Sequence, residues 1–233
     1  MKMAPREAAI KFIESEFPSC LGAILSGSVI RGDYTETSDL DLIIIENRPN
    51  AYRESLIKFD WKIEVFVYDH ISYKSFFESD IKRARPSIIR MIAEGITLKN
   101  HPILENIIIE AKQLLKSGPD KWDEQTVASK HYFLSDVFED FIGSTNKYEL
   151  ICIANTLLER LAEFILRTNN CWIGSSKWIY RELAEFDRVL TDEIFSAFHI
   201  FYESGDKKEV INLIDSILKP FGGKLFEGFK VGD

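Results

Sequence analysis

The sequence predicts an α/β domain over residues 1–118, followed by an all-helical domain over residues 119–233. In the first half, short apolar runs bounded by polar turn residues alternate with amphipathic segments, which is typical of strands and helices within one domain. After residue 120, apolar residues recur only at helical spacing. Between the halves, the segment Ser117-Gly118-Pro119-Asp120 contains two helix-breaking residues, and it is the expected linker.

The first helix is expected from Pro5 to Phe17, because proline favours a first helical turn and the apolar residues that follow are spaced for one helix face. Strands are placed on the apolar runs, and the run from Trp61 to Tyr68 alternates with a period of two. Gly95 is expected to end a helix. In chain order the expected elements are helix 5–17, strand 21–26, strand 39–45, loop 46–50, helix 52–59, strand 61–68, helix 72–80, helix 86–94, strand 96–99 and helix 101–116.

In the second half, apolar residues such as Leu157, Leu161 and Ile165 recur three or four residues apart. This spacing predicts amphipathic helices that pack on one another. The expected helices are 123–142, 147–169, 176–187, 190–203 and 207–218. Gly222-Gly223 then begins a tail that we expect to fray.

The 233-residue chain is 45% hydrophobic, which is enough to form packed cores in one or two domains. Its formal net charge of −8 argues against a nucleic-acid partner, because such proteins usually carry a basic surface. No apolar run approaches the roughly 18 residues of a membrane helix, and the first residues lack the pattern of a signal peptide. We therefore expect no membrane association and a cytoplasmic location.

Asp39 and Asp41 begin the apolar run 39–45. Residues two apart on a strand point to the same face, so the two carboxylates are expected side by side where the strand starts. Two carboxylates that close together repel each other unless a cation lies between them. Mg²⁺ prefers oxygen ligands and usually arrives with substrate phosphates, so the pair predicts a magnesium site, with a solvated pair at a strand start as the alternative.

Glu64 lies inside the expected strand 61–68, on the face opposite its apolar residues. An ionised glutamate within an apolar strand is costly without a partner. We expect it to join Asp39 and Asp41 in a two-metal centre of the kind that suits in-line displacement at phosphorus. The alternatives are an ion pair with Lys62, which shares its face, or a charge that protects an edge strand from aggregation.

Gly27 and Ser28 follow the expected strand 21–26. Glycine allows backbone N–H groups to approach phosphate oxygens because it has no Cβ, and the serine hydroxyl can donate to the β- or γ-phosphate. A tight turn without a ligand is the alternative. Arg31 is expected to contact the same triphosphate, unless it is an ordinary exposed arginine, and Ser38 either orients the neighbouring aspartate or contacts phosphate.

The segments Gly27-Ser28-Val29-Ile30-Arg31-Gly32 and Ser38-Asp39-Leu40-Asp41-Leu42, with the later acid Glu64, resemble the signature of the polymerase-β-like nucleotidyltransferase superfamily. The resemblance covers about residues 21–68 and is to the small bacterial branch, which includes the aminoglycoside and lincosamide nucleotidyltransferases. It implies a nucleotidyltransferase domain with a mixed sheet over residues 1–118 and a helical bundle over residues 119–233.

The resemblance also implies an enzyme that transfers NMP from ATP or another NTP to a hydroxyl of a small-molecule acceptor and releases pyrophosphate. It assigns Mg²⁺, with two ions expected, to Asp39 and Asp41, and the triphosphate to Gly27 and Ser28. Glu64 would then ligate the second ion or remove the acceptor proton. An aminoglycoside-like acceptor and a homodimer are expectations carried over from the antibiotic-modifying members.

In the helical half, Asp136 and Asp140 lie four residues apart on one helix face. The resemblance suggests that this face binds a cationic acceptor or supplies a general base, with a solvated acidic face as the alternative. Lys177 and Arg181 share another face, in a segment that resembles a motif in the helical domains of these enzymes. They are expected to bind phosphates, unless they are exposed cations at a helix start.

Three other functions match part of the sequence. An antitoxin-like enzyme that adenylylates a protein usually has its helical part on a separate chain. An NTP-binding sensor without catalysis would not need three intact acids. An RNA-tailing enzyme is disfavoured by the acidic net charge and by the lack of a basic, aromatic-rich strand path.

Overall fold

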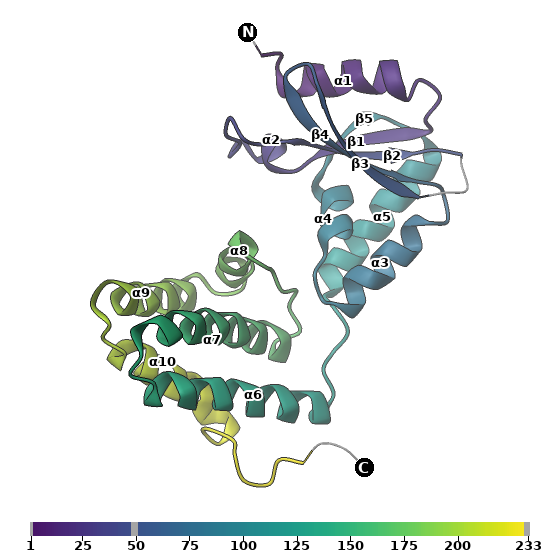
Figure 1. Ribbon diagram of the computed structural model, residues 1–233. Helices are drawn as coiled ribbons and strands as arrows, with labels where there is room; N and C mark the ends of the chain where they lie inside the picture. Colours follow the sequence, from purple (N-terminus) through teal and green to yellow (C-terminus); the bar gives the residue numbers. More distant parts are fainter. Residues whose placement is uncertain (1, 48–50, 231–233) are drawn as a thin grey trace. The chain divides into compact units, whose positions relative to one another are not determined.

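The computed structural model describes residues 2–47 and 51–230 and divides into two compact units, Met1–Gly118 and Pro119–Asp233. The elements of each unit are labelled in Figure 1. Residues 48–50 of the expected loop 46–50 lie outside the described residues. Each unit has its own buried core, and we describe the two separately.

The first unit is built on a five-stranded sheet with the strand order β3-β4-β2-β1-β5. Strands β2 and β4 are parallel neighbours, and the other neighbouring pairs are antiparallel. The sheet is therefore mixed, as predicted. Its strands are β1 (Gly22–Ser26), β2 (Leu40–Ile45), β3 (Tyr52–Lys58), β4 (Trp61–Tyr68) and β5 (Ile96–Lys99).

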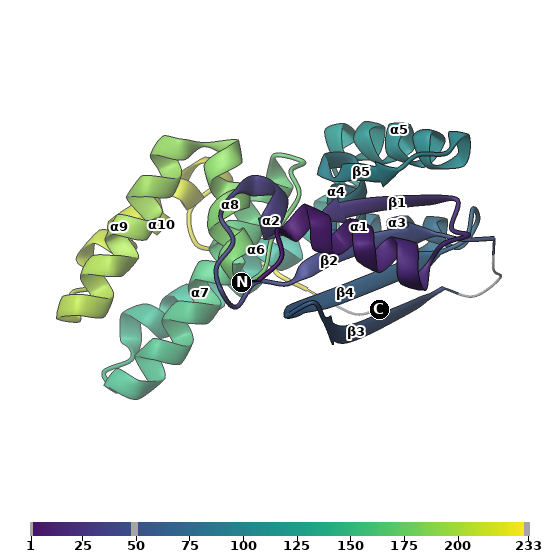
Figure 2. The same ribbon diagram turned by 90° about the horizontal axis from the view of Figure 1, so that it is seen from above.

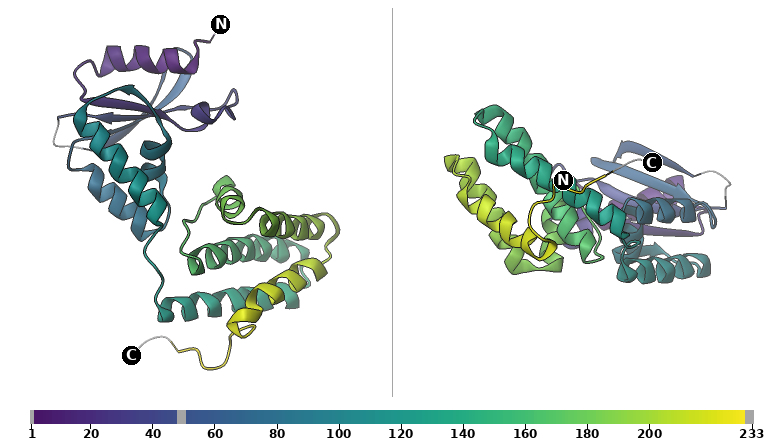
Figure 3. Two further views of the ribbon diagram at one scale, coloured as in Figure 1. Left: turned by 180° about the vertical axis from the view of Figure 1, so that it is seen from behind. Right: turned by 90° about the horizontal axis from the view of Figure 1, so that it is seen from below.

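Helices cover both faces of this sheet. Helix α1 packs over β1 and β2 on one face, as the view from above shows (Figure 2). Helices α3, α4 and α5 lie on the opposite face, which is clearest from behind (Figure 3). The helices of this unit are α1 (Pro5–Glu16), α2 (Ser28–Arg31), α3 (Tyr73–Lys82), α4 (Ser87–Glu94) and α5 (Pro102–Ser117).

Strand β2 lies at the centre of the unit because its side chains are apolar on both faces. Leu40, Leu42 and Ile44 are fully buried in the core beneath α1, and the intervening Ile43 and Ile45 are fully buried on the other face. A strand with this composition must be covered on both sides. Its polar residue is Asp41, which is thereby held at one end of an otherwise closed core.

The helix expected over residues 52–59 is wrong, because this segment is the strand β3. It pairs with β4 in an antiparallel hairpin whose two turn residues, Phe59 and Asp60, have φ values of 53° and 62°. Positive φ at both central residues is the requirement of a type I′ hairpin turn, which usually selects Asn-Gly or Asp-Gly. Because the chain uses Phe-Asp instead, the usual hairpin signal is absent. The strand is also an edge strand with mostly exposed side chains, so it lacks an apolar face.

The connection between α3 and α4 depends on one buried carboxylate. Asp80, at 0% exposure, accepts hydrogen bonds from the backbone N–H groups of Ile88 and Ile89 at 2.7 and 3.0 Å. These groups belong to the first turn of α4, where no backbone acceptor is available to them. Asp80 also pairs with Arg83. A side chain of α3 therefore caps the start of α4.

The second unit is entirely helical within the residues that the structure describes. Successive helices α6 and α7, α7 and α8, α8 and α9, and α9 and α10 pack against one another. Its core is rich in aromatic residues, including Phe141 and Phe201, whose ring centroids are 4.9 Å apart. The elements are α6 (Glu124–Gly143), α7 (Lys147–Thr168), α8 (Lys177–Phe186), α9 (Arg188–Ser204), α10 (Lys208–Leu218) and the short 3₁₀ helix η1 (Lys219–Phe221).

The tail after Gly222 packs back on α6, so the expectation that it frays is wrong for the residues described. The Nε2 atom of His131 and the carbonyl oxygen of Gly223 are 2.7 Å apart. The backbone N–H of Leu225 donates to Ser135 Oγ at 2.9 Å. The His131 ring and the Ser135 hydroxyl of α6 thus hold the described part of the tail by hydrogen bonds.

The predicted fold class is confirmed: an α+β unit with a mixed sheet precedes a helical unit. Among residues 2–47 and 51–230, none of the helices combines the length and the apolar character needed to cross a membrane.

Candidate metal centre

Three acidic side chains meet at one edge of the sheet of the first unit. In the parallel pairing of β2 with β4, Asp41 lies directly beside Glu64. Asp39 immediately precedes β2 and has the same parity as Asp41, so it points to the same face. One carboxylate oxygen from each residue lies within 4.8 Å of the others, and all three side chains are half-buried. Among the described residues, this is the group of acids arranged to hold a metal ion.

The electrostatics of this cluster favour a cation. Burial, with the negative charges of Asp39 and Glu64, raises the pKa of Asp41 to about 6. The positive charges of Arg53 and Arg31 act in the opposite direction but are weaker. A carboxyl group with a pKa of about 6 has too little positive charge around it to stabilise its ionised form fully. A divalent ion would supply that charge, so this donor set of three carboxylates fits Mg²⁺.

Glu64 forms its ion pair with Arg53, whose Nη2 atom is 2.6 Å from Glu64 Oε2. Lys62, which was the expected alternative partner, is exposed and two residues away on the same strand. Arg53 comes from β3, and sequence reasoning missed it because that segment was predicted to be a helix. The hairpin with β4 is what brings it to the acids.

Gly27 lies against the Asp41 carboxylate. Its φ is 80°, and a Cβ placed there would lie only 2.0 Å from Asp41 Oδ2. Both the backbone conformation and the close approach therefore require glycine. The residue directly before it, Ser26, is the register partner of Asp41 across β1 and β2. This pairing fixes the end of β1, and with it Gly27, beside the acids.

Ser28 begins the one-turn helix α2, which the sequence patterns had not predicted. Arg31 ends this turn and lies 3.6 Å from Asp33, measured from Nε to Oδ1. Ser38 Oγ accepts a hydrogen bond of 2.9 Å from the backbone N–H of Thr35. In this structure the Ser38 hydroxyl thus orders the loop before β2. The phosphate contacts expected of Ser28, Arg31 and Ser38 stay predictions.

The predicted residues of the second unit lie on two helices. Asp136 and Asp140 are exposed on α6. On α8, Lys177 is exposed and Arg181 is half-buried, with its guanidinium 5.0 Å from the centroid of the Trp178 ring. Their roles toward acceptor and phosphate stay predictions.

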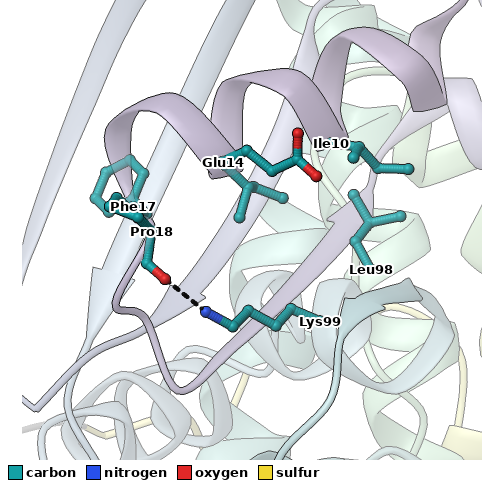
Figure 4. A pocket seen from close by; sticks show the side chains of 7 residues that line it. Ile10, Glu14, Phe17, Pro18, Leu98 and Lys99 are labelled. Carbon is teal, nitrogen blue, oxygen red and sulfur yellow. Dashed lines mark hydrogen bonds between the residues drawn. The ribbon is translucent and has the colours of Figure 1, made fainter.

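A cavity of about 320 Å³ opens between α1 and β5 in the first unit (Figure 4). Its lining is largely apolar, and its charged members are Glu14 and Lys99. The Lys99 ammonium donates to the carbonyl oxygen of Pro18 at 2.9 Å. No member of the acidic cluster lines this cavity, and it has no paired carboxylates. It therefore lacks the convergent carboxylates that would hold a metal ion.

Comparisons with known proteins show that the acidic cluster lies in a segment similar to a known domain family. Residues 6–98, which include all three acids, match the family described as the nucleotidyltransferase domain. A solved structure of a nucleotidyltransferase-like protein from Exiguobacterium sibiricum is similar over 89% of this chain and 71% of that chain, with 16% identity and a TM-score of 0.45. No protein with curated annotation matches this chain. Residues 6–98 of the first unit are thus similar to the nucleotidyltransferase domain family.

Proposed function

We propose that this protein is a magnesium-dependent nucleotidyltransferase that transfers NMP, most simply AMP from ATP, to a hydroxyl group of a small-molecule acceptor. One observation supports this most directly. Asp39, Asp41 and Glu64 bring three carboxylate oxygens within 4.8 Å of one another, inside a segment that matches the nucleotidyltransferase domain. Such a domain acts on nucleotides, and three convergent carboxylates are the oxygen donors that Mg²⁺ prefers.

The three acids would hold magnesium, and we expect two ions. When bound, the ions would neutralise charge on the phosphates and favour ionisation of the attacking hydroxyl. Asp39 and Asp41 hold the site at the end of a fully covered strand, which keeps their carboxylates in fixed positions. Glu64 either completes the ligand set or accepts the proton of the acceptor hydroxyl.

Gly27 and Ser28 are proposed to bind the triphosphate. Gly27 has no side chain between its backbone and the Asp41 carboxylate, so a phosphate bound to a metal ion at the acids would lie near this turn. The Ser28 hydroxyl would donate to a phosphate oxygen, and Arg31 would add positive charge. In-line displacement then places pyrophosphate on the Gly27 side and the acceptor on the opposite side of the α-phosphorus.

The helical unit is proposed to contribute to substrate binding. Asp136 and Asp140 would attract a cationic acceptor, such as an aminoglycoside-like alcohol. Lys177 and Arg181 would bind phosphate oxygens. This assignment follows the resemblance to the aminoglycoside and lincosamide nucleotidyltransferases.

A turnover assay tests the proposal. The protein is incubated with Mg²⁺, α-labelled ATP and a panel of hydroxyl-bearing acceptors, and both pyrophosphate and labelled product are measured. We expect Asp41→Asn to reduce turnover by at least about 100-fold, because it removes a charged ligand from the shared centre. Circular dichroism should show an unchanged fold.

Three results would contradict the proposal. An unchanged rate in Asp41→Asn would refute the metal assignment. ATP binding without turnover on any acceptor would indicate a sensor. Transfer of the label to a co-purified protein would indicate a protein adenylyltransferase.

A further inference from the structure

Arg53 is the arginine that pairs directly with a member of the acidic cluster, Glu64. It lies on the edge strand β3, directly opposite Phe66 and diagonal to Glu64 in the antiparallel pairing with β4. Its Nη2 atom is 2.6 Å from Glu64 Oε2. The centre of its guanidinium is 4.9 Å from the Phe66 ring centroid. The arginine is therefore held by a carboxylate and an aromatic face on the neighbouring strand.

The guanidinium compensates only part of the charge of the cluster. Three carboxylates converge within 4.8 Å, whereas Arg53 contributes one positive charge and pairs with one of them. Its field also reaches Asp41, where it acts to lower the pKa. The cluster as a whole thus retains an excess of negative charge and can accept a divalent ion.

Arg53 and a divalent ion compete for the same carboxylate. Mg²⁺ binds carboxylate oxygens at about 2.1 Å, and an arginine that donates to Glu64 Oε2 restricts the approach to that oxygen. The two cations would also repel each other at such a short distance. Because the Arg53 side chain is 58% exposed, it can leave Glu64 and be hydrated, and the Phe66 ring provides a second surface for it.

We infer that Arg53 is an exchangeable counter-ion of Glu64: it neutralises this carboxylate while the centre is empty and is displaced when a divalent ion binds. The inference rests on the proposed function, because it assumes that the three acids hold metal. Arg53 is a positioning residue in this scheme. It keeps Glu64 oriented toward the cluster, at the cost of weaker metal binding.

The first experiment measures Mn²⁺ binding to the full-length protein by isothermal titration calorimetry and electron paramagnetic resonance, without nucleotide. Arg53→Met should bind Mn²⁺ about fivefold more tightly than the unmodified protein, because an exposed ion pair contributes up to about 1 kcal/mol. The matched control is Lys62→Met, which removes the same charge from β4 and should change the affinity by less than about twofold. Arg53→Lys, which keeps the charge, should stay near the unmodified value.

A double-mutant cycle separates exchange from a general effect of charge. In a Glu64→Gln background, Arg53→Met should raise Mn²⁺ affinity by less than about twofold, because the carboxylate for which the two cations compete is gone and only the weaker effect of the Arg53 charge on Asp41 remains. Equal tightening in both backgrounds would overturn the inference and show that Arg53 acts only through its field. Unchanged or weaker Mn²⁺ binding in the single variant Arg53→Met would also overturn it.

The failure of this inference can be told from the failure of the proposed function. If Asp41→Asn weakens Mn²⁺ binding but Arg53→Met does not strengthen it, the metal centre stands and only the exchange is wrong. If the unmodified protein binds no Mn²⁺, or if Asp41→Asn has no effect on binding, both are wrong. Circular dichroism of each variant checks that the fold is retained.

Discussion

Gly27 couples a backbone conformation to the position of the Asp41 carboxylate. Its φ of 80° disfavours any side chain, and a Cβ would lie 2.0 Å from Asp41 Oδ2. Gly32 has nearly the same φ, 78°, but nothing lies within 4 Å of the position its Cβ would occupy. The two glycines therefore separate the cost of backbone strain from the cost of displacing Asp41.

We predict that Gly32→Ala lowers the free energy of unfolding by about 1–2 kcal/mol, because it places alanine at positive φ, and that Gly27→Ala lowers it further, because the new Cβ must also displace Asp41. Only Gly27→Ala should also weaken Mn²⁺ binding, by about 10-fold or more, because the Asp41 carboxylate must move. Urea unfolding and Mn²⁺ titration measure the two effects. Equal Mn²⁺ affinity in the two variants would show that Gly27 is needed only for the turn.

The raised pKa of Asp41 makes metal binding dependent on pH. Protons compete with metal for this carboxylate up to a pH of about 6, so Mn²⁺ affinity should rise as the pH increases from about 5 to about 7. Asp39→Asn removes one like charge and should move this rise to lower pH. Calorimetric titrations at several pH values measure this dependence. A Mn²⁺ affinity that does not change with pH would contradict the environment assigned to Asp41.

Asp41 also makes the stability of the protein without bound metal depend on pH. This stability should decrease as the pH rises, whereas the metal affinity should increase. Between about pH 4 and about pH 6, the folded chain retains a proton on Asp41 that the unfolded chain has lost. The contribution of Asp41 to the free energy of unfolding should therefore decrease as the pH rises from about 4 to about 6. Saturating Mn²⁺ should reverse the loss, because it binds the ionised form.

At the scale of elements, the start of α4 depends on a carboxylate from α3. We predict that Asp80→Ala lowers the free energy of unfolding by about 3 kcal/mol, because it leaves two backbone N–H groups and Arg83 without their buried acceptor. The matched control is Asp123→Ala, which removes an exposed N-cap of α6 and should cost about 1 kcal/mol. Urea unfolding measures the stability of both variants. An equal decrease in the free energy of unfolding would show that the burial of Asp80 does not increase the stability that its hydrogen bonds contribute.

The strands that carry the acids could be predicted from sequence because their side-chain patterns are unambiguous. The run 39–45 is apolar on both faces, and the run 61–68 alternates, so the parity of Asp41 and Glu64 follows directly. Strand β3 could not be predicted because an exposed edge strand has no apolar face, and its turn lacks glycine and asparagine. The one-turn helix α2 is too short for any periodic signal.

The difference between strands with a clear side-chain pattern and strand β3, which has none, also explains which site residues could be predicted. The three acids were located by type and spacing alone, and the register of β2 with β4 places Asp41 and Glu64 side by side. Arg53 was missed because its position depends on a hairpin that was predicted to be a helix. The structure does not test the assignment of residues on α6 and α8 to substrate, and that part of the interpretation still rests on resemblance.

At the scale of the whole molecule, the two units have separate cores, and the proposed metal ligands all come from the first. We predict that Mn²⁺ slows amide hydrogen exchange in β1, β2 and β4 and leaves α6 to α10 unchanged, because bound metal stabilises only the structure that holds its ligands. Mass spectrometry of peptide fragments measures this. Asp41→Asn is the control, and protection that extends into the helical unit would contradict the prediction.

The parallel pairing of β2 with β4 also determines when the site can form during translation. A growing chain that has released Asp39 and Asp41 still lacks Glu64 and the strand that aligns it. The hairpin that carries Arg53 must be completed first, because β3 precedes β4 in the chain. A metal ion that needs all three acids can therefore be bound only after β4 has been synthesised. By then Arg53, on the earlier strand β3, is already available to pair with Glu64.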